Sequence, residues 1–226
     1  MVRTVEAITP SSRHVLCLSA VRSAFRDFIG KYGLERDNRL FIYYAGSGYT
    51  TRPVYAQARH DEWMGFLVPV DEAFSMERFA SLAREIEAKH ALFVFDMCFA
   101  TAPAFSLDKA PPEPSSHTLD ESTTEAVRQF IFAGTTDQKV PDDSFFSKFL
   151  VEALAGDREA DLNSDGYLTG SELGRFLQAK VTTVTRGAQT PHYGKMSDPR
   201  LNRGEFVFLP GNNARPPTAG ALPTGW

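Results

Sequence analysis

The feature that most constrains the fold is an alternation of short apolar, β-rich runs with stretches of helical periodicity. Five such runs, each bounded by turn residues, are residues 40–45, 65–68, 91–96, 129–133 and 205–209. Strands that alternate with helices form βα units, and these units pack around a largely parallel sheet. The order of elements therefore predicts an α/β domain.

Four stretches are predicted to be helices, because apolar residues recur along them at spacings of three and four. They are residues 12–32, 76–89, 144–155 and 170–181. The first is expected to stop at Gly33, the second to begin at Ser75 and the third to end at Gly156. Residues 110–124 are rich in Pro, Ser and Thr and are predicted to form an exposed loop.

Length and charge exclude several classes of protein. The chain has 226 residues, which suits one domain at residues 1–210 followed by a disordered, Gly-, Pro- and Ala-rich tail at residues 211–226. Its 24 basic and 28 acidic residues give a net charge of −4, which argues against binding to nucleic acid. The apolar runs are too short to span a membrane, and no signal-peptide pattern follows Met1. We expect a cytoplasmic protein with no nucleic-acid or membrane partner.

Cysteine is scarce, and one cysteine has a suggestive position. Cys17 and Cys98 are too few for a disulfide framework and lack the spacing of a zinc site. Cys98 follows the apolar run at 91–96, and Gly46-Ser47-Gly48 follows the run at 40–45. The carboxyl ends of parallel strands lie at one edge of a sheet, so the two turns are expected to be close. A cysteine after a strand is, however, more often a small core residue than a nucleophile.

Seven segments carry a resemblance to a known family through their order and spacing. They are LFIYYAGSGYT, GFLVPVDEA, ALFVFDMCFA, FIFAGTTDQKVPDDSFFSKFLVEALAG, ADLNSDGYLTGSELGRFL, QTPHYGK and GEFVF. Together they cover most of residues 20–209, and they resemble the caspase-like cysteine peptidases, specifically the bacterial metacaspase-like branch. The resemblance implies a caspase-like three-layer α/β/α sandwich with a mostly parallel sheet.

The resemblance implies a cysteine-peptidase mechanism that this chain carries only in part. In the family a thiolate attacks the scissile carbonyl, a His protonates the leaving amine, and backbone N–H groups hold the oxyanion. The matching positions are Cys98 as nucleophile, Gly48 as oxyanion donor, and Ser47 where the family has its His, 51 residues before Cys98. A serine hydroxyl does not titrate near neutral pH and cannot lower the pKa of a thiol as imidazole does. The expected protein is a peptidase homologue that is catalytically impaired or inactive.

Two acids could still select a ligand. In metacaspase-like relatives, acids near the nucleophile select Arg or Lys before the cleaved bond, and the matching positions are Asp96 and Asp137. A carboxylate in a pocket is a suitable partner for a basic side chain of a peptide or protein. The alternative role for both acids is the capping of turns.

An alternative function is an active Arg/Lys-directed endopeptidase with a substitute acid–base group. His60 and His117 lie in loops that could reach the site, whereas His90 is expected at the far end of its strand.

An acidic loop at residues 161–172 matches the EF-hand pattern of oxygen ligands at its first, third, fifth, ninth and twelfth positions, with Gly at the sixth. The calcium ligands would be Asp161, Asn163, Asp165, the Tyr167 carbonyl, Thr169 through water, and Glu172. The alternative is a capping box from Thr169 to Glu172 that opens the last helix. The family's chemistry requires no cofactor, so calcium is optional here. A calcium-responsive binding module is a further alternative function.

The beginning of the chain departs from the family. Caspase-like domains begin with a strand and a helix ahead of the matched segment, whereas this chain offers only one short strand, at residues 2–7, before its first helix. The family's first strand is therefore expected to be missing, as in an N-terminal truncation. Loss of a central strand leaves backbone N–H and C=O groups of its neighbour unpaired. Alternatively, a partner chain completes the sheet, or residues 2–7 fill the gap.

Overall fold

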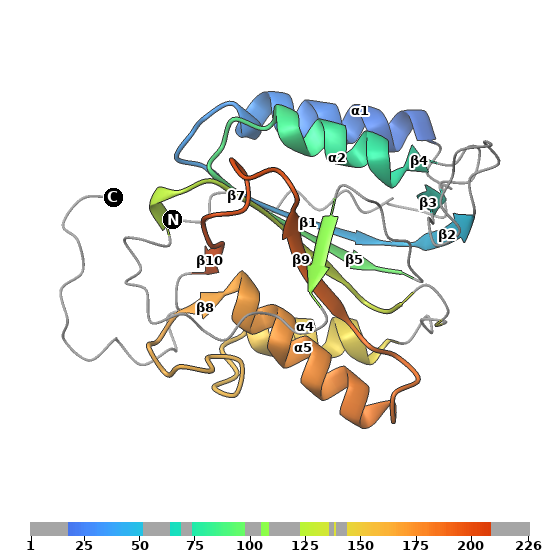
Figure 1. Cartoon of the computed structure of the whole chain (residues 1–226), viewed down its shortest axis with the longest axis vertical. Coiled ribbons are helices and arrows are strands. Elements are labelled where there is room, and N and C mark those ends of the chain that lie inside the picture. The colour runs from blue at the N-terminus through green and yellow to red at the C-terminus, as the bar shows by residue number, and fades with distance from the viewer. Residues whose placement is uncertain are drawn as a thin grey trace.

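The architecture is a central sheet between two layers of helices (Figure 1). The structure is a computed structural model, and it describes residues 18–51, 64–68, 74–97, 105–108, 123–135, 138 and 144–208. The central sheet has five strands in the order β1-β5-β7-β9-β6. These are β1 (Arg39–Ala45), β5 (His90–Asp96), β7 (Val127–Phe132), β9 (His192–Met196) and β6 (Phe105–Asp108).

Most strands of this sheet run in one direction. β1 pairs with β5 and β5 with β7 in parallel, while β9 is antiparallel to both of its neighbours, β7 and β6. β9 alone is therefore reversed, and the predicted mostly parallel sheet is confirmed. The carboxyl ends of β1, β5 and β7 consequently share one edge of the sheet, where β9 begins with His192 opposite Phe132.

Side chains that alternate along the strands build the two helical interfaces. α1 (Leu18–Phe28) and α2 (Met76–Glu85) cover one face, and α4 (Phe145–Leu154) and α5 (Gly170–Val184) cover the other (Figure 1). On β5, Phe93 and Phe95 pack on the α1/α2 side, and Leu92 and Val94 on the α4/α5 side. β5 is thus buried on both faces, as expected for the central strand of a three-layer α/β/α sandwich.

Polar caps explain where three helices begin. The Ser75 hydroxyl accepts from the N–H of Arg78, and the Ser144 hydroxyl accepts from the N–H of Phe146, so the predicted N-cap at Ser75 is confirmed. Thr169 opens α5. α1 continues into one π-helical turn, Ile29–Gly33, which confirms the predicted stop at Gly33. Such caps satisfy backbone N–H groups that a helix leaves unpaired.

α2 ends at Glu85 rather than at the predicted Lys89. Ile86 has an extended conformation (φ −70°, ψ 123°). The guanidinium of Arg128 then donates to the carbonyls of Ala83 (2.9 Å) and Ile86. Because the last carbonyls of a helix have no partner within it, a basic side chain can cap them. A tertiary contact therefore decides the end of α2.

Two predicted strands lie outside the central sheet. The run at 65–68 belongs to an antiparallel sheet of β2 (Ser47–Thr51), β3 (Met64–Val68) and β4 (Phe74–Ser75). The run at 205–209 supplies only β10 (Val207–Phe208), which pairs with β8 (Leu168–Thr169). The central sheet instead contains β9 and β6, which the sequence did not predict. β9 has the sequence HYGKM, and α5 packs closely against it. A Cβ added at Gly174 of α5 would lie only 2.8 Å from the side chain of Tyr193 in β9.

β1 is the outer strand on its side of the sheet, as far as the structure describes the chain. The predicted strand at residues 2–7, most of the predicted loop at 110–124 and the predicted tail at 211–226 lie outside the described residues. Within those residues, none of the helices combines the length and the apolar character needed to cross a membrane.

Candidate active site

The carboxyl edge of the sheet brings together two of the predicted segments. Asp96 ends β5 directly opposite Ala45, the last residue of β1, and the N–H of Gly46 donates to the Asp96 carbonyl (3.3 Å). Ser47 and Gly48 follow at once, as the first residues of β2. The segment after β1 is thus a strand rather than the expected turn, and it is held beside Asp96 as predicted.

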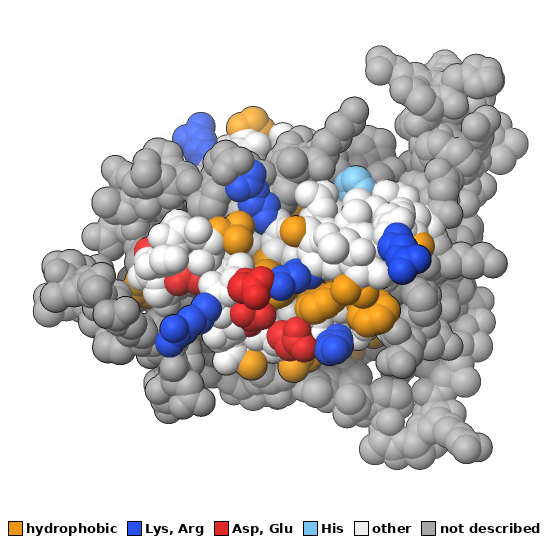
Figure 2. Space-filling model, turned by 90° about the horizontal axis from the view of Figure 1, so that it is seen from below, with side chains coloured by type: hydrophobic (Ala, Val, Ile, Leu, Met, Phe, Trp, Pro, Cys, Tyr) orange, Lys and Arg blue, Asp and Glu red, His pale blue; other side chains and the backbone are white. Residues whose placement is uncertain are grey.

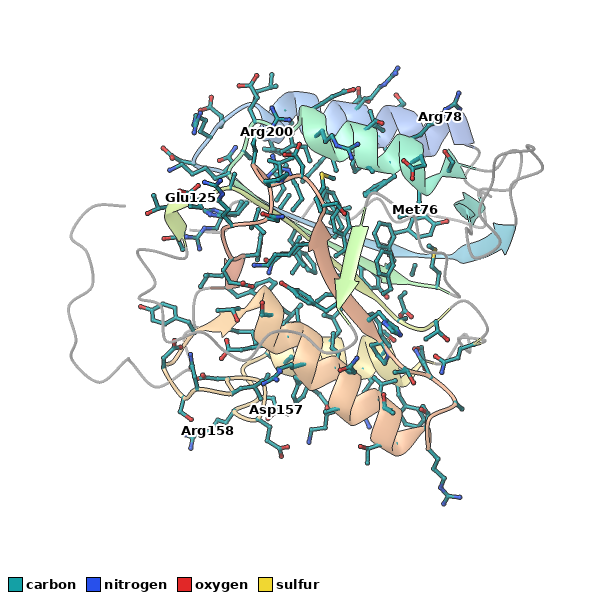
Figure 3. The ribbon with its side chains drawn as sticks, in the orientation of Figure 1. Met76, Arg78, Glu125, Asp157, Arg158 and Arg200 are labelled. Atoms are coloured by element: carbon teal, nitrogen blue, oxygen red, sulfur yellow. The ribbon has the colours of Figure 1, made fainter. Side chains whose placement is uncertain are left out.

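Several predicted residues are not placed. Cys98 and Asp137 lie outside the described residues, as do His60 and His117, so their approach to Ser47 stays a prediction. His90 lies at the amino end of β5, and its Nε2 is 3.2 Å from the carbonyl of Glu125. Figure 3 shows Glu125 at the end of the molecule opposite Met76, which begins α2 near the carboxyl edge. His90 is therefore remote from the site, as predicted.

The two carboxylate oxygens of Asp96 differ in their hydrogen bonds. The Tyr43 hydroxyl donates to Oδ2 (2.9 Å), whereas Oδ1 is buried and has no hydrogen bond of ordinary geometry. Burial raises the pKa of Asp96, and the hydroxyls of Tyr43, Ser144 and Ser147 act against that rise. A buried acceptor without a donor costs about 1–3 kcal/mol, so it demands an explanation. Oδ1 is an acceptor ready for a donor from outside the described residues.

The first turn of α4 forms one wall of this site. Ser144 Oγ accepts from the N–H of Phe146 (3.1 Å) and from Nε2 of Gln189 (3.3 Å). Ser147 Oγ donates to the carbonyl of Ser144 (3.0 Å), which leaves its oxygen lone pairs as acceptors. Gln189 Nε2 also donates to the carbonyl of Ala133, just after β7 (2.9 Å). The wall is therefore fixed to the end of β7 by hydrogen bonds.

Another side chain fixes the segment that follows β7. Gln138 Oε1 accepts from the N–H groups of Thr135 (3.1 Å) and Thr190 (2.7 Å), which joins the exit of β7 to the entry of β9. Sequence reasoning missed Gln138, and it also missed Tyr43, Ser144 and Ser147 as neighbours of Asp96. The β1–β5 register was the available signal for Tyr43. A residue two positions before the partner of Asp96 shares its face and can reach it.

His192 is a histidine at the carboxyl edge that sequence reasoning left without a role. It pairs with Phe132, which in turn pairs with Phe95, so it lies two strands away from β5. Neighbouring strands are about 4.8 Å apart, which places its Cα roughly 10 Å from that of Phe95. Burial lowers the pKa of His192 and so favours its neutral form.

Comparison with known proteins establishes the family. A family model described as the caspase domain matches residues 12–200, which is most of the chain. The chain therefore belongs to the caspase family. A solved structure, protein GSU0716 from Geobacter sulfurreducens, is similar with a TM-score of 0.51 and 14% identity, over 85% of this chain and 79% of that chain. At that identity the likeness concerns the fold alone. No curated protein matches the chain.

The acidic loop of this caspase domain has the conformation of a capped turn. The Thr169 hydroxyl accepts from the N–H of Glu172 (3.2 Å), and Glu172 Oε2 accepts from the N–H of Thr169 (2.9 Å), which is the predicted capping box. Asp161 accepts through both carboxylate oxygens, from the N–H groups of Asp165 (3.2 Å) and Gly166 (2.9 Å). The capping alternative is confirmed as the structure of these residues.

Calcium binding by this loop stays a prediction. Among the residues that the structure describes, no three His, Cys, Asp or Glu side chains are grouped so as to hold a metal ion. Glu172 is fully buried, and burial raises its pKa. The loop also lies far from Asp96, because Gly170 packs against Gln129 in the amino half of β7. In Figure 1, β8 and β2 mark the two opposite ends of the sheet.

Proposed function

We propose that this caspase domain binds peptides through a basic side chain that Asp96 receives, and that its peptidase activity is impaired. The observation that carries the proposal is the buried, unpaired Oδ1 of Asp96 at the carboxyl edge. A Lys or Arg side chain would supply the missing donor and compensate the buried charge. The resemblance to metacaspase-like relatives supports the same ligand class.

Impaired catalysis is inferred from Ser47. A working Cys–His pair needs a group that accepts the thiol proton and returns it to the leaving amine. Serine supplies no such group near neutral pH, so Cys98 would be a thiolate only to a few per cent at pH 7. The domain would keep the recognition of its ligand and lose most of the turnover.

Peptide binding tests the first half of the proposal. Acetylated peptide amides ending in Lys, Arg or the neutral, isosteric norleucine should differ in Kd, with both basic peptides tighter by about tenfold or more. Asp96→Asn should abolish that difference. The matched control is Asp157→Asn, because Asp157 accepts from the N–H of Glu159 in the turn after α4 and is remote from the site (Figure 3). Equal binding of all three peptides to the native protein would contradict the pocket.

Turnover tests the second half. Fluorogenic Arg and Lys peptides should be cleaved weakly or not at all by the native protein, and Ser47→His should raise the rate. Turnover by the native protein that Cys98→Ala abolishes would show that the domain is not impaired. Cys98→Ala in the Ser47→His background is the control that assigns the gained rate to this thiol.

A second candidate function is an active cysteine endopeptidase that uses His192 as its acid–base group. It is favoured by the position of His192 at the same edge as Asp96 and by its lowered pKa, which keeps the ring neutral and able to accept a proton. This candidate predicts native turnover that both Cys98→Ala and His192→Gln abolish. Turnover that survives His192→Gln would exclude the assignment.

A further inference from the structure

We propose that Tyr43 makes the Asp96 pocket selective for lysine over arginine. The inference rests on the proposed pocket for a basic side chain and concerns which basic side chain fits it. It follows from the asymmetry of the carboxylate, whose Oδ2 accepts from the Tyr43 hydroxyl while Oδ1 has no hydrogen bond of ordinary geometry.

The occupied oxygen removes the geometry that arginine uses best. A guanidinium binds a carboxylate through two parallel N–H···O bonds, and these need both oxygens. Here the Tyr43 hydroxyl holds Oδ2 at 2.9 Å. Tyr43 extends from β1 on the same face as Asp96, so its hydroxyl fixes the carboxylate orientation as well as filling one oxygen.

The remaining acceptors suit a compact ammonium. Lysine has three donors on one atom, whereas arginine has five in a rigid plane. Near the carboxylate, Oδ1 has no hydrogen bond of ordinary geometry, and the hydroxyls of Ser144 and Ser147 lie beside it. An ammonium can point two donors at these oxygens and a third at the Tyr43 oxygen. A guanidinium would be restricted to one oxygen of the carboxylate and would lose the second of its two parallel hydrogen bonds.

Tyr43 is accordingly a residue that positions the carboxylate and determines specificity. Its ring is 42% exposed, so removal of the hydroxyl leaves no large cavity in the core. Tyr43→Phe frees Oδ2 and should let arginine bind through both oxygens. Tyr44→Phe is the matched control, because Tyr44 is the next residue of β1 and its ring lies on the opposite face, 6.4 Å from that of Phe95.

The experiment measures Kd for the Lys, Arg and norleucine peptide amides with the native chain, Tyr43→Phe and Tyr44→Phe. The native protein should prefer Lys to Arg by about tenfold, the equivalent of about 1.4 kcal/mol. Tyr43→Phe should reduce that ratio to about one or reverse it, while Tyr44→Phe should keep it. A merely structural role for Tyr43 would weaken both peptides equally, and thermal melting of each variant verifies that it is folded.

Three outcomes would overturn the inference. Tighter or equal binding of the Arg peptide by the native protein would refute lysine selectivity while leaving the proposed function intact. A preference for Lys that Tyr43→Phe does not change would refute the role of Tyr43. Failure of both basic peptides to bind better than norleucine would remove the pocket itself, and the proposed function with it.

Discussion

Two charged side chains, the buried Arg128 and the half-buried Asp96, lie at opposite ends of the same sheet and differ in how their hydrogen-bonding groups are satisfied. Arg128, 1% exposed, donates to the carbonyls of Ala83, Ile86, Lys89 and Val127. Asp96 accepts one hydrogen bond of ordinary geometry, from Tyr43, and its buried Oδ1 has none. A charge surrounded by backbone acceptors stabilises a fold, whereas a charge left short of donors is typical of a site that awaits a ligand. The comparison separates a structural charge from a functional one.

Removal of Arg128 should give the largest effect. Arg128→Met would leave the carbonyls of Ala83 and Ile86 at the end of α2 without this donor, so the free energy of unfolding should fall by about 3–5 kcal/mol. Urea unfolding followed by circular dichroism measures this loss. Arg200→Met is the control, because Arg200 is exposed and pairs with Asp198 at the surface (2.8 Å), and it should change stability by less than about 0.5 kcal/mol. Similar losses of unfolding free energy in Arg128→Met and Arg200→Met would show that the buried hydrogen bonds of Arg128 are not what stabilises the fold.

The amino end should also govern stability at acid pH. Burial, followed by the nearby Arg39 charge, lowers the pKa of His90 from 6.5 to about 4. The unfolded chain therefore binds a proton that the folded chain does not, and stability should fall as pH drops from 6.5 to 4, by about 3 kcal/mol. His90→Asn should flatten this part of the curve of stability against pH. An unchanged slope of stability against pH in His90→Asn would show that His90 does not cause the loss of stability at acid pH.

The carboxyl end should show the opposite dependence on pH, with a smaller magnitude. Burial raises the pKa of Asp96 above 3.8, its value in the unfolded chain. At pH values between the unfolded and the folded pKa, the folded state therefore binds more protons than the unfolded chain. The contribution of Asp96 to stability falls as pH rises through this range. Asp96→Asn should therefore stabilise the protein at pH 7 and change its stability little below pH 3.8. Thermal melts at pH 3.5 and 7 measure the difference. A variant that is less stable than the native chain at pH 7 would show that Asp96 is structural.

The smallest effect is expected at the acidic loop. Thr169→Ala removes the side-chain half of the capping box and should lower stability by about 1 kcal/mol, with or without calcium. Calcium binding predicts in addition a heat of binding in calorimetric titration that Glu172→Gln abolishes. No heat with either protein would leave the loop a capped turn. This experiment asks whether the amino end holds a ligand site as well as the structural charge at Arg128.

Among the described residues, the charged side chains on the molecular surface form no further site on the face that α4 and α5 present. On the face formed by α4 and α5, acidic and basic side chains are interspersed with apolar ones (Figure 2). Lys180, for example, pairs with the exposed Glu159 between α5 and the turn after α4. Such exposed pairs contribute little to stability. The groups that discriminate between structure and function in this domain are the buried ones.

Sequence patterns predicted the layers because burial leaves a direct mark on composition. The run at 91–96 is apolar at nearly every position, and β5 is the strand buried on both faces. The caps at Ser75 and Thr169 were also visible, because they depend on residues within one turn. β9 was missed because its glycine and polar residues show no strand pattern until α5 covers them.

Only those residues of the candidate site that are recognisable by their place in the sequence could be predicted. Asp96, Ser47 and Gly48 were identified from the resemblance to caspase-like peptidases and from their positions at the ends of two strands, and the parallel register brings them together. Tyr43 and Ser147 were not identified, because neither position differs in the sequence from an ordinary strand or helix residue. Their importance comes from contacts across elements that are far apart in the chain.

By itself, the sequence determined the α/β class, the start of each capped helix, the resemblance to caspases and the serine at the family's His position. All four features depend on local patterns or on the identity of single residues, and both can be seen in the sequence without the fold. Folding was needed to show that Arg128 donates to four carbonyls, whereas Oδ1 of Asp96 has no hydrogen bond of ordinary geometry. The number of partners around a buried charge depends on segments brought together by folding, since a hydrogen bond requires a distance of about 3 Å that no sequence spacing fixes.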